Sequence, residues 1–247
     1  MISNMIVIPD IHGRTFWKEA VKDRENELII FLGDYLDPYT GLEDITKEDA
    51  YNNFIEILEF KKAHMDNVIL LIGNHDCTYA IGTNICDCRA DYARKKDISK
   101  LFDDNKDLFQ LAYEVIIDGK KYIFSHAGIH QGYFQACFGK EENINNAVKL
   151  FNDAYKEDNY GLLNTLGIVS GYRGGWSRYG SIVWADIREF LNDPETFAYQ
   201  IVGHTQMRGP IVTDTIAALD CHRAFIFDNG NIYELDGTLV EKHVFKT

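Results

Sequence analysis

Five short clusters of Asp, His and Asn side chains are spread along the chain, and these residue types bind metal ions or transfer protons. The clusters read PDIHG from residue 9, GDYLD from 33, GNHD from 73, SHAG from 125 and GHT from 203. Carboxylate and amide oxygens suit hard divalent cations, whereas imidazole suits zinc, iron and manganese. Six side chains match this set: Asp10, His12, Asp34, Asn74, His126 and His204. Together they predict a site for a pair of cations.

A pair of cations needs a carboxylate that binds both. Such a residue holds the ions about 3.5–4 Å apart, so that they clamp the attacking and leaving oxygens of a displacement. Asp34 is the residue that we expect to be shared. Glycines stand beside the clusters, among them Gly73 and Gly203, and they would let the backbone come close to a bound anion.

The clusters follow predicted strands. Residues 5–8, 28–32 and 68–72 are short apolar runs typical of buried strands, and segments 15–22 and 47–64 between them have helical periodicity. Alternation of this kind favours a parallel sheet with crossover helices, whose ligands bind at the carboxyl ends of the strands. We therefore expect the five clusters to meet at one edge of the structure.

The rest of the chain reads as one further set of elements. We expect helix over 89–111 and 131–155, a hairpin of strands 113–117 and 121–124 around the Asp118–Gly119 turn, and a long loop over 160–181. The final third predicts a β-meander of strands 197–202, 224–227, 232–235 and 239–245. No linker composition or repeat divides residues 1–247, which predicts a single domain.

Charge and composition restrict the partners. The formal net charge is −13, from 38 acidic and 25 basic residues, which argues against duplex nucleic acid and anionic membranes as partners. No run approaches the ~20 apolar residues of a membrane span, and the first residues do not resemble a secretion signal. Five irregularly spaced cysteines argue against a disulfide framework. We expect a cytoplasmic protein whose thiols are reduced.

Three of the cysteines leave two interpretations open. Cys77, Cys86 and Cys88 could form a zinc or redox cluster, but no C-x-x-C spacing or second Cys/His pair follows them. The interpretation that we favour is that they are small, partly buried thiols in a helical stretch after Asn84.

In order and spacing, the five clusters resemble the calcineurin-like metallophosphoesterase superfamily, and especially the bacterial type of its phosphoprotein phosphatase branch. The first three resemble the motifs G-D-x-H-G, G-D-x-x-D-R-G and G-N-H-E, and the resemblance extends from residue 9 to about 206. It implies an α/β fold, the calcineurin-like four-layer α/β/β/α sandwich, in which helices flank a central pair of β-sheets.

The resemblance also implies roles for individual residues. Two metal sites would share Asp34: Asp10 and His12 complete the first, and Asn74, His126 and His204 complete the second. The cofactors would be two divalent ions of manganese, iron or zinc, and a water bridging them would attack phosphorus. His75 matches the general acid of the family, and Asp37 matches the carboxylate that orients it. A nearby carboxylate favours the imidazolium form of such an acid.

Two arginines of the family pattern are missing, because Pro38 and Ile72 occupy their positions. A phosphate clamp must then come from elsewhere. We expect Arg173 and Arg178, in the glycine-rich segment 171–180, to bind phosphate, since a guanidinium can grip two phosphate oxygens at once. The alternative is that both cap a surface loop.

Neighbouring residues have less defined roles. Tyr172, Trp176 and Tyr179 interleave with the arginines and could line a pocket for a nucleobase or a phosphotyrosine ring, or pack the loop down. Gln206 could reach a metal through water, and Arg208 could face the cleft, although Arg173 is the stronger candidate.

Three functions fit this sequence. The first is a phosphomonoesterase, which includes a phosphoprotein phosphatase acting on phosphoserine, phosphothreonine or phosphotyrosine. The second is a nucleotide hydrolase that cleaves a dinucleoside polyphosphate or a cyclic nucleotide. The third is a non-catalytic metal-binding scaffold, which would have no chemical need for His75 and Asp37. The natural substrate and the oligomeric state stay open.

Overall fold

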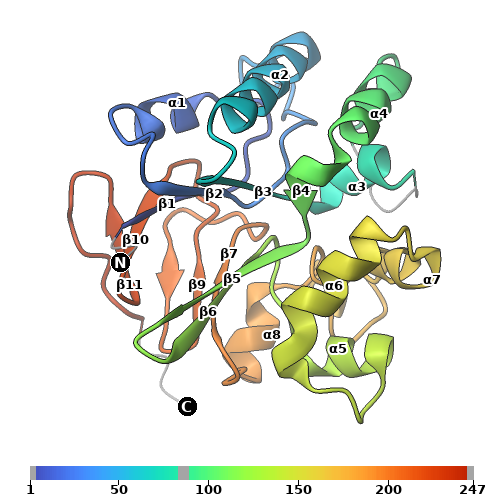
Figure 1. Cartoon of the computed structure of the whole chain (residues 1–247), viewed down its shortest axis with the longest axis vertical. Coiled ribbons are helices and arrows are strands. Elements are labelled where there is room, and N and C mark those ends of the chain that lie inside the picture. The colour runs from blue at the N-terminus through green and yellow to red at the C-terminus, as the bar shows by residue number, and fades with distance from the viewer. Residues whose placement is uncertain (1–3, 83–88, 244–247) are drawn as a thin grey trace.

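A computed structural model describes residues 4–82 and 89–243, and its first half alternates strands with helices (Figure 1). The elements in order are β1 (Met5–Ile8), α1 (Phe16–Val21), β2 (Leu28–Phe31), α2 (Lys47–Ala63) and β3 (Val68–Leu71). The three strands pair in parallel, with β2 between β1 and β3. The predicted parallel sheet with crossover helices is confirmed for this half of the chain.

Two mixed sheets form the centre of the molecule. The first has the order β11-β10-β1-β2-β3-β4, with β4 at Phe109–Gln110, β10 at Phe225–Asp228 and β11 at Asn231–Glu234. The second has the order β5-β6-β7-β9-β8, built from the strands β5 (Ala112–Ile117), β6 (Lys120–Ser125), β7 (Tyr199–Val202), β8 (Ile211–Val212) and β9 (Ile216–Ala218). The expected hairpin is β5–β6.

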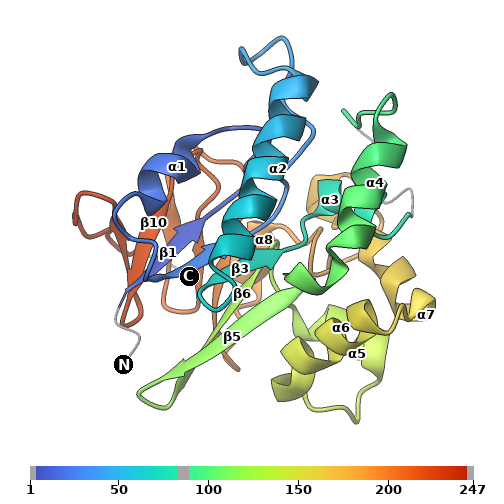
Figure 2. The same ribbon diagram turned by 45° about the horizontal axis from the view of Figure 1, so that its top comes forward.

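The alternation of side chains along β1 assigns one face to each neighbouring layer. Met5 and Val7 pack in the core between the two sheets, together with Phe124 and Ile201 of the second sheet. Ile6 and Ile8 face the opposite way, into the core that holds Trp17 of α1 and Phe54 of α2. Figure 2 shows α1 and α2 on the outer face of the first sheet.

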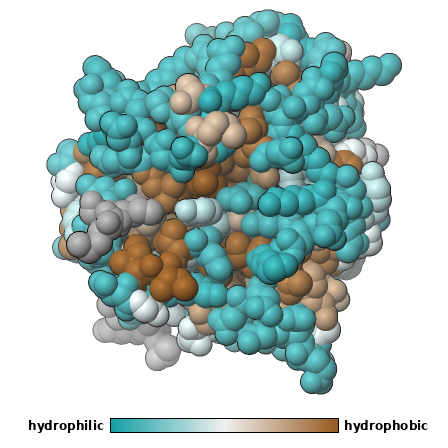
Figure 3. All heavy atoms as spheres, in the orientation of Figure 1, coloured by the Kyte–Doolittle hydropathy of each residue, from teal (hydrophilic) through white to brown (hydrophobic). Residues whose placement is uncertain are grey.

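The outer face of the second sheet packs on α8 (Ile187–Asn192). Phe190 of this helix shares a cluster with Val202 of β7 and Ala218 of β9. The order of layers is therefore helices, sheet, sheet and helix, as the four-layer sandwich requires. Figure 3 shows that hydrophilic residues cover most of one face, while apolar residues are visible near its middle. Within the described residues, no helix is long and apolar enough to cross a membrane.

Of the remaining helices, three are shorter than the segments predicted to be helical, and two, α3 and α7, were not predicted. They are α3 (Asn74–Ala80), α4 (Lys95–Asp104), α5 (Gln131–Phe138), α6 (Ala147–Lys156) and α7 (Tyr160–Leu163). Segment 89–111 is helical only in α4 and in a 3-10 turn at Lys106–Leu108, before it enters β4. The predicted loop over 160–181 contains α7 and two 3-10 turns, Asn164–Gly167 and Gly171–Arg173.

The predicted β-meander in the final third is wrong. Strands β7 and β9 lie parallel in the second sheet, whereas β10 and β11 join the first sheet through an antiparallel pairing of β10 with β1. The described part of the predicted last strand, residues 239–243, forms only an isolated bridge between Tyr233 and Leu239. Local alternation marks a strand but does not say which sheet it joins, because the partner is chosen by burial across the whole core.

Candidate metal centre

All five predicted clusters lie at or just beyond the carboxyl ends of strands, in the order β1, β2, β3, β6 and β7. The backbone there is unusual: His12, Asp34 and His204 have φ angles of 43°, 54° and 62°. Non-glycine residues seldom adopt this left-handed conformation, which costs of order ~1–3 kcal/mol and clusters at functional sites. The fold therefore holds these three side chains in positions that their local sequence does not favour.

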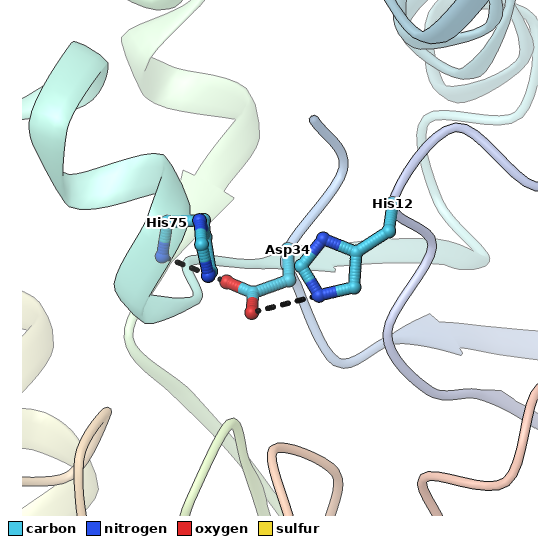
Figure 4. Close-up of side chains that lie close together, drawn as sticks. All are labelled: His12, Asp34 and His75. Atoms are coloured by element: carbon cyan, nitrogen blue, oxygen red, sulfur yellow. Dashed lines mark hydrogen bonds and ion pairs between the residues drawn. The ribbon is translucent and has the colours of Figure 1, made fainter. Parts of the chain in front are cut away.

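Asp34 occupies the centre of the group and is 1% exposed. Its Oδ2 atom lies 3.5 Å from Nε2 of His12 and also 3.5 Å from Nε2 of His126. Its Oδ1 atom accepts a hydrogen bond of 2.9 Å from the backbone N–H of His75. Figure 4 shows the carboxylate between the His12 ring and the start of α3. One carboxylate thus faces two imidazoles that come from different clusters.

Each of the two imidazoles faces Asp34 with a ring nitrogen that carries no hydrogen. Nδ1 of His12 lies 2.8 Å from the carbonyl oxygen of Leu36, and Nδ1 of His126 lies 2.8 Å from that of Leu32. A carbonyl can only accept, so each Nδ1 carries the proton and each Nε2 keeps its lone pair. The lone pairs point at a carboxylate oxygen, an arrangement that repels unless a cation lies between them. This is the donor set and orientation of a metal ligand.

A second group of acceptors surrounds His126. Its Nε2 atom is 2.9 Å from Oδ1 of Asn74 and 3.1 Å from Nδ1 of His204. Since Nε2 of His126 cannot donate, its contact with the amide oxygen also places two acceptors together. Ligand atoms of Asp34, His126 and His204 all lie within 4.8 Å of one another. The residues present fit a cation at this position.

The electrostatics agree with neutral imidazoles. Burial is the main cause that lowers the pKa of His12, His126 and His204, and the shift is large for His12 and His204. The charge of Arg173 adds to the lowering of the His204 pKa. A neutral ring is the form that binds a metal, so burial prepares these residues for coordination.

Asp10 connects the first cluster to the fifth. It is 2% exposed, and its Oδ1 atom accepts a hydrogen bond of 2.8 Å from the backbone N–H of His204. Gly203 lies directly against it, because a Cβ at this glycine would be 2.3 Å from the same carboxylate oxygen. All six predicted ligand residues are therefore buried and lie together.

Asp76 connects two of the clusters, a role that the sequence pattern did not indicate. Its carboxylate accepts backbone N–H groups of Asp34 at 2.7 Å, Gly73 at 2.8 Å and Tyr35 at 3.1 Å. These bonds tie the second cluster to the third. The signal was present, since an acidic residue three positions after Gly73 has capping-box spacing at the start of a helix.

His75 and Asp37 form a buried pair beside the group. Nδ1 of His75 lies 2.9 Å from Oδ2 of Asp37 and donates to it. The hydroxyl of Tyr79 donates to the other oxygen of Asp37, and the backbone N–H of Asp91 donates to that hydroxyl at 2.7 Å. The orientation of the His75 ring is therefore set by a chain of hydrogen bonds.

The structure separates the two predicted phosphate-binding arginines. One nitrogen of Arg173 is 3.7 Å from Oδ2 of Asp186, and its charge adds to the effect of burial in lowering the pKa of His126. Arg178 instead stacks on Tyr179, with 5.1 Å between its guanidinium carbon and the ring centroid. It lines a different pocket of about 330 Å³, together with Tyr172, Tyr179, Glu189, Asn192 and Asp193.

Three other residues singled out from the sequence lie on the surface. Gln206 is exposed and its amide contacts the ring of His222, Arg208 is exposed, and Trp176 is fully exposed. Cys77 is a buried free thiol. Cys86 and Cys88, the other members of the possible cysteine cluster, lie outside the described residues.

A search of curated proteins matches serine/threonine-protein phosphatase 7 of Arabidopsis thaliana, which is 29% identical over 143 residues. That alignment covers 52% of this chain but only 30% of the relative, so the chain matches less than a third of the plant protein's length.

Solved structures of phosphatases share the fold. A cold-active protein-tyrosine phosphatase of a psychrophilic Shewanella species superposes with a TM-score of 0.54 at 16% identity, covering 97% of this chain and 80% of that one. A protein serine/threonine phosphatase from Saccharomyces cerevisiae superposes with a TM-score of 0.53 at 12% identity, covering 100% and 82%. The sequence model of the calcineurin-like phosphoesterases matches residues 4–208, and the chain belongs to that family.

Proposed function

We propose that this protein hydrolyses phosphoesters with the help of two divalent cations. The observation that carries the proposal is the position of one oxygen of Asp34, 3.5 Å from the bare nitrogens of both His12 and His126. Asp10 and His12 would complete one cation site, and Asn74, His126 and His204 the other. Manganese, iron and zinc suit this mixture of oxygen and imidazole ligands.

When bound, the cations would lower the pKa of water and offset the charge of the phosphoryl oxygens. The protein itself supplies the remaining functions. His75 donates a proton to the leaving oxygen, and Asp37 holds its ring by accepting the Nδ1 proton. Arg173 provides positive charge on the side of His204 and is our candidate for binding a phosphoryl oxygen there.

We infer that the substrate is a phosphomonoester, and a phosphorylated protein side chain is one candidate. Membership of the phosphoesterase family and the likeness to phosphatases support this choice. A nucleotide substrate is the second candidate, favoured by Trp176, which is fully exposed three residues after Arg173 and could stack on a base. The five irregularly spaced cysteines support a reducing, cytoplasmic setting.

Elemental analysis combined with a phosphate-release screen tests the proposal. We expect about two equivalents of Mn²⁺ per chain after loading, and metal-dependent release of phosphate from phosphopeptides or dinucleoside polyphosphates. Asp34→Asn should lower the affinity for both cations by more than ~100-fold, because mutation of even an outer-shell partner of a metal lowers metal affinity about 10–100-fold.

A matched control is Asp104→Asn, which removes an exposed carboxylate that pairs with Lys100. This variant should keep the metal content and rate of the wild type. Full metal occupancy in Asp34→Asn, or a wild-type protein that binds no cation, would contradict the proposed site. A strong preference for either substrate class decides between the two candidates.

A further inference from the structure

We propose that Arg89 binds a phosphoryl oxygen of the substrate beside His75, and so takes the place of the arginine that the chain lacks at position 38. The inference rests on the proposed function and adds a residue that no motif in the sequence indicates. Arg89 lies between α3 and α4, fourteen residues after His75. Its contacts place it at the edge of the metal centre.

Three contacts fix the position of the Arg89 guanidinium. Its Nε donates to the backbone carbonyl of Asp37 at 3.0 Å, and one of its terminal nitrogens, Nη2, lies 3.1 Å from Nε2 of His75. The guanidinium carbon lies 3.8 Å from the centroid of the Tyr39 ring, which is stacking distance. Arg89 is therefore positioned before any ligand binds, which lowers the entropy cost of using it.

The guanidinium borders the first proposed cation site. The His75 ring centroid is 5.0 Å from that of His12, and the Tyr39 centroid is 5.2 Å from it. Arg89 contacts both His75 and Tyr39, and His12 lies next to the same two residues. A phosphoryl group bound at the cations would lie within reach of its donors.

The charge of Arg89 has no carboxylate partner within 4.0 Å among residues 4–82 and 89–243. Arg173, the other arginine near the centre, faces Asp186. Arg14, which also lies over the Tyr39 ring, is held by both oxygens of Glu43. A half-buried guanidinium without a counter-charge is suited to an anion that arrives from solution.

The position of Arg89 explains why it can substitute for the arginine that is missing at position 38. The carbonyl that it contacts belongs to Asp37, the residue immediately before Pro38. The guanidinium thus reaches the second cluster from the connection between α3 and α4 instead of from the cluster itself. Sequence spacing could not show this, because Asp37 and Arg89 are 52 residues apart in the chain.

The contact with His75 has a consequence for the order of events. Since Nδ1 of His75 donates to Asp37, its Nε2 accepts the N–H of Arg89 in this structure. A phosphoryl oxygen would attract the same N–H more strongly, because the bond would be charge-assisted on both sides. Binding of the phosphoryl group would then draw Arg89 away from Nε2 of His75, and this nitrogen would take up a proton from solvent before it protonates the leaving oxygen.

The test is binding of orthophosphate to Arg89→Ala and Arg89→Lys, measured by calorimetry with and without Mn²⁺. We expect the dissociation constant to rise about 10–100-fold in Arg89→Ala and less in Arg89→Lys, which keeps a point charge. KM for a phosphomonoester should rise with it, and metal content should not change. Arg94→Ala is the matched control, since Arg94 lies in the same segment, stacks on Tyr51 and pairs with Glu48.

An unchanged affinity for orthophosphate in Arg89→Ala, together with a lower kcat, would overturn the inference and make Arg89 a residue that only positions His75. Urea unfolding of each variant checks that the fold is kept, and Arg89→Lys gives a second reading if Arg89→Ala is unstable. If the wild type binds orthophosphate but no cation, the proposed function is wrong and the Arg89 comparison still decides this inference. If it binds neither, both are wrong.

Discussion

The substitution Gly73→Ala tests the candidate metal centre, because it adds a single methyl group next to Asp34. Gly73 is the residue before α3 and packs directly on the backbone and side chain of Asp34. A Cβ at this position would lie 2.2 Å from Oδ1 of Asp34, 2.6 Å from its backbone nitrogen and 2.8 Å from Cγ. The φ angle of −96° is allowed for alanine, so any effect of the substitution is steric.

The size of the effect follows from these distances. Real Cβ contacts essentially never fall below 3.0 Å, so the carboxylate of Asp34 has to move by about 0.8 Å or more. Overpacking of this kind costs about 1–3 kcal/mol of unfolding free energy. A shift of about 1 Å in a positioned group can lower the rate by ~10²-fold. We therefore expect a lower unfolding free energy, a lower rate of hydrolysis and weaker binding of both cations.

A comparison with Gly203→Ala distinguishes between the two proposed cation sites. A Cβ at Gly203 would lie 2.3 Å from Oδ1 of Asp10, which belongs to only one of the proposed sites. This variant should therefore lose one cation preferentially, whereas Gly73→Ala should weaken both. Gly209→Ala is the control, because its Cβ would meet no heavy atom within 4 Å.

The assay is elemental analysis after gel filtration, together with urea unfolding and phosphate release from p-nitrophenyl phosphate. A Gly73→Ala protein that holds two cations and turns over at the wild-type rate would contradict the role of Asp34 as a ligand of both cations. The same pattern of metal loss in both glycine variants would show that Asp10 affects both cation sites, since its Oδ1 atom also accepts the backbone N–H of His204.

Two further substitutions give independent outcomes. His75→Asn should lower kcat by ~10²–10⁴-fold on a substrate with a poor leaving group while metal content stays the same, as expected for loss of a general acid; equal effects on good and poor leaving groups would contradict this role. Asn152→Ala should lower the unfolding free energy by about 2–4 kcal/mol, because the Asn152 side chain accepts the N–H groups of Leu111 and Ala112 and donates to the Ala112 carbonyl. Urea unfolding measures the loss, and a change below about 1 kcal/mol would show that these bonds contribute little.

Much of the architecture follows from local patterns. The apolar runs that became β1, β2 and β3 were recognisable because a strand buried on both faces needs uninterrupted Ile, Leu and Val, and the helical periodicity of α2 reflects its single buried face. The six candidate ligands were also identifiable, since residue type and position after a strand are local properties.

Local sequence patterns were therefore enough to predict the alternation of strands and helices in the first half of the chain and the residue types at the strand ends. Long-range packing was needed to show that β10 and β11 complete the first sheet, that Asp76 connects two clusters and that Arg89 contacts His75. It also separated Arg173, which faces Asp186, from Arg178, which stacks on Tyr179. Such contacts join segments far apart in the chain, and they depend on which surfaces the whole core buries, a property that no local pattern records.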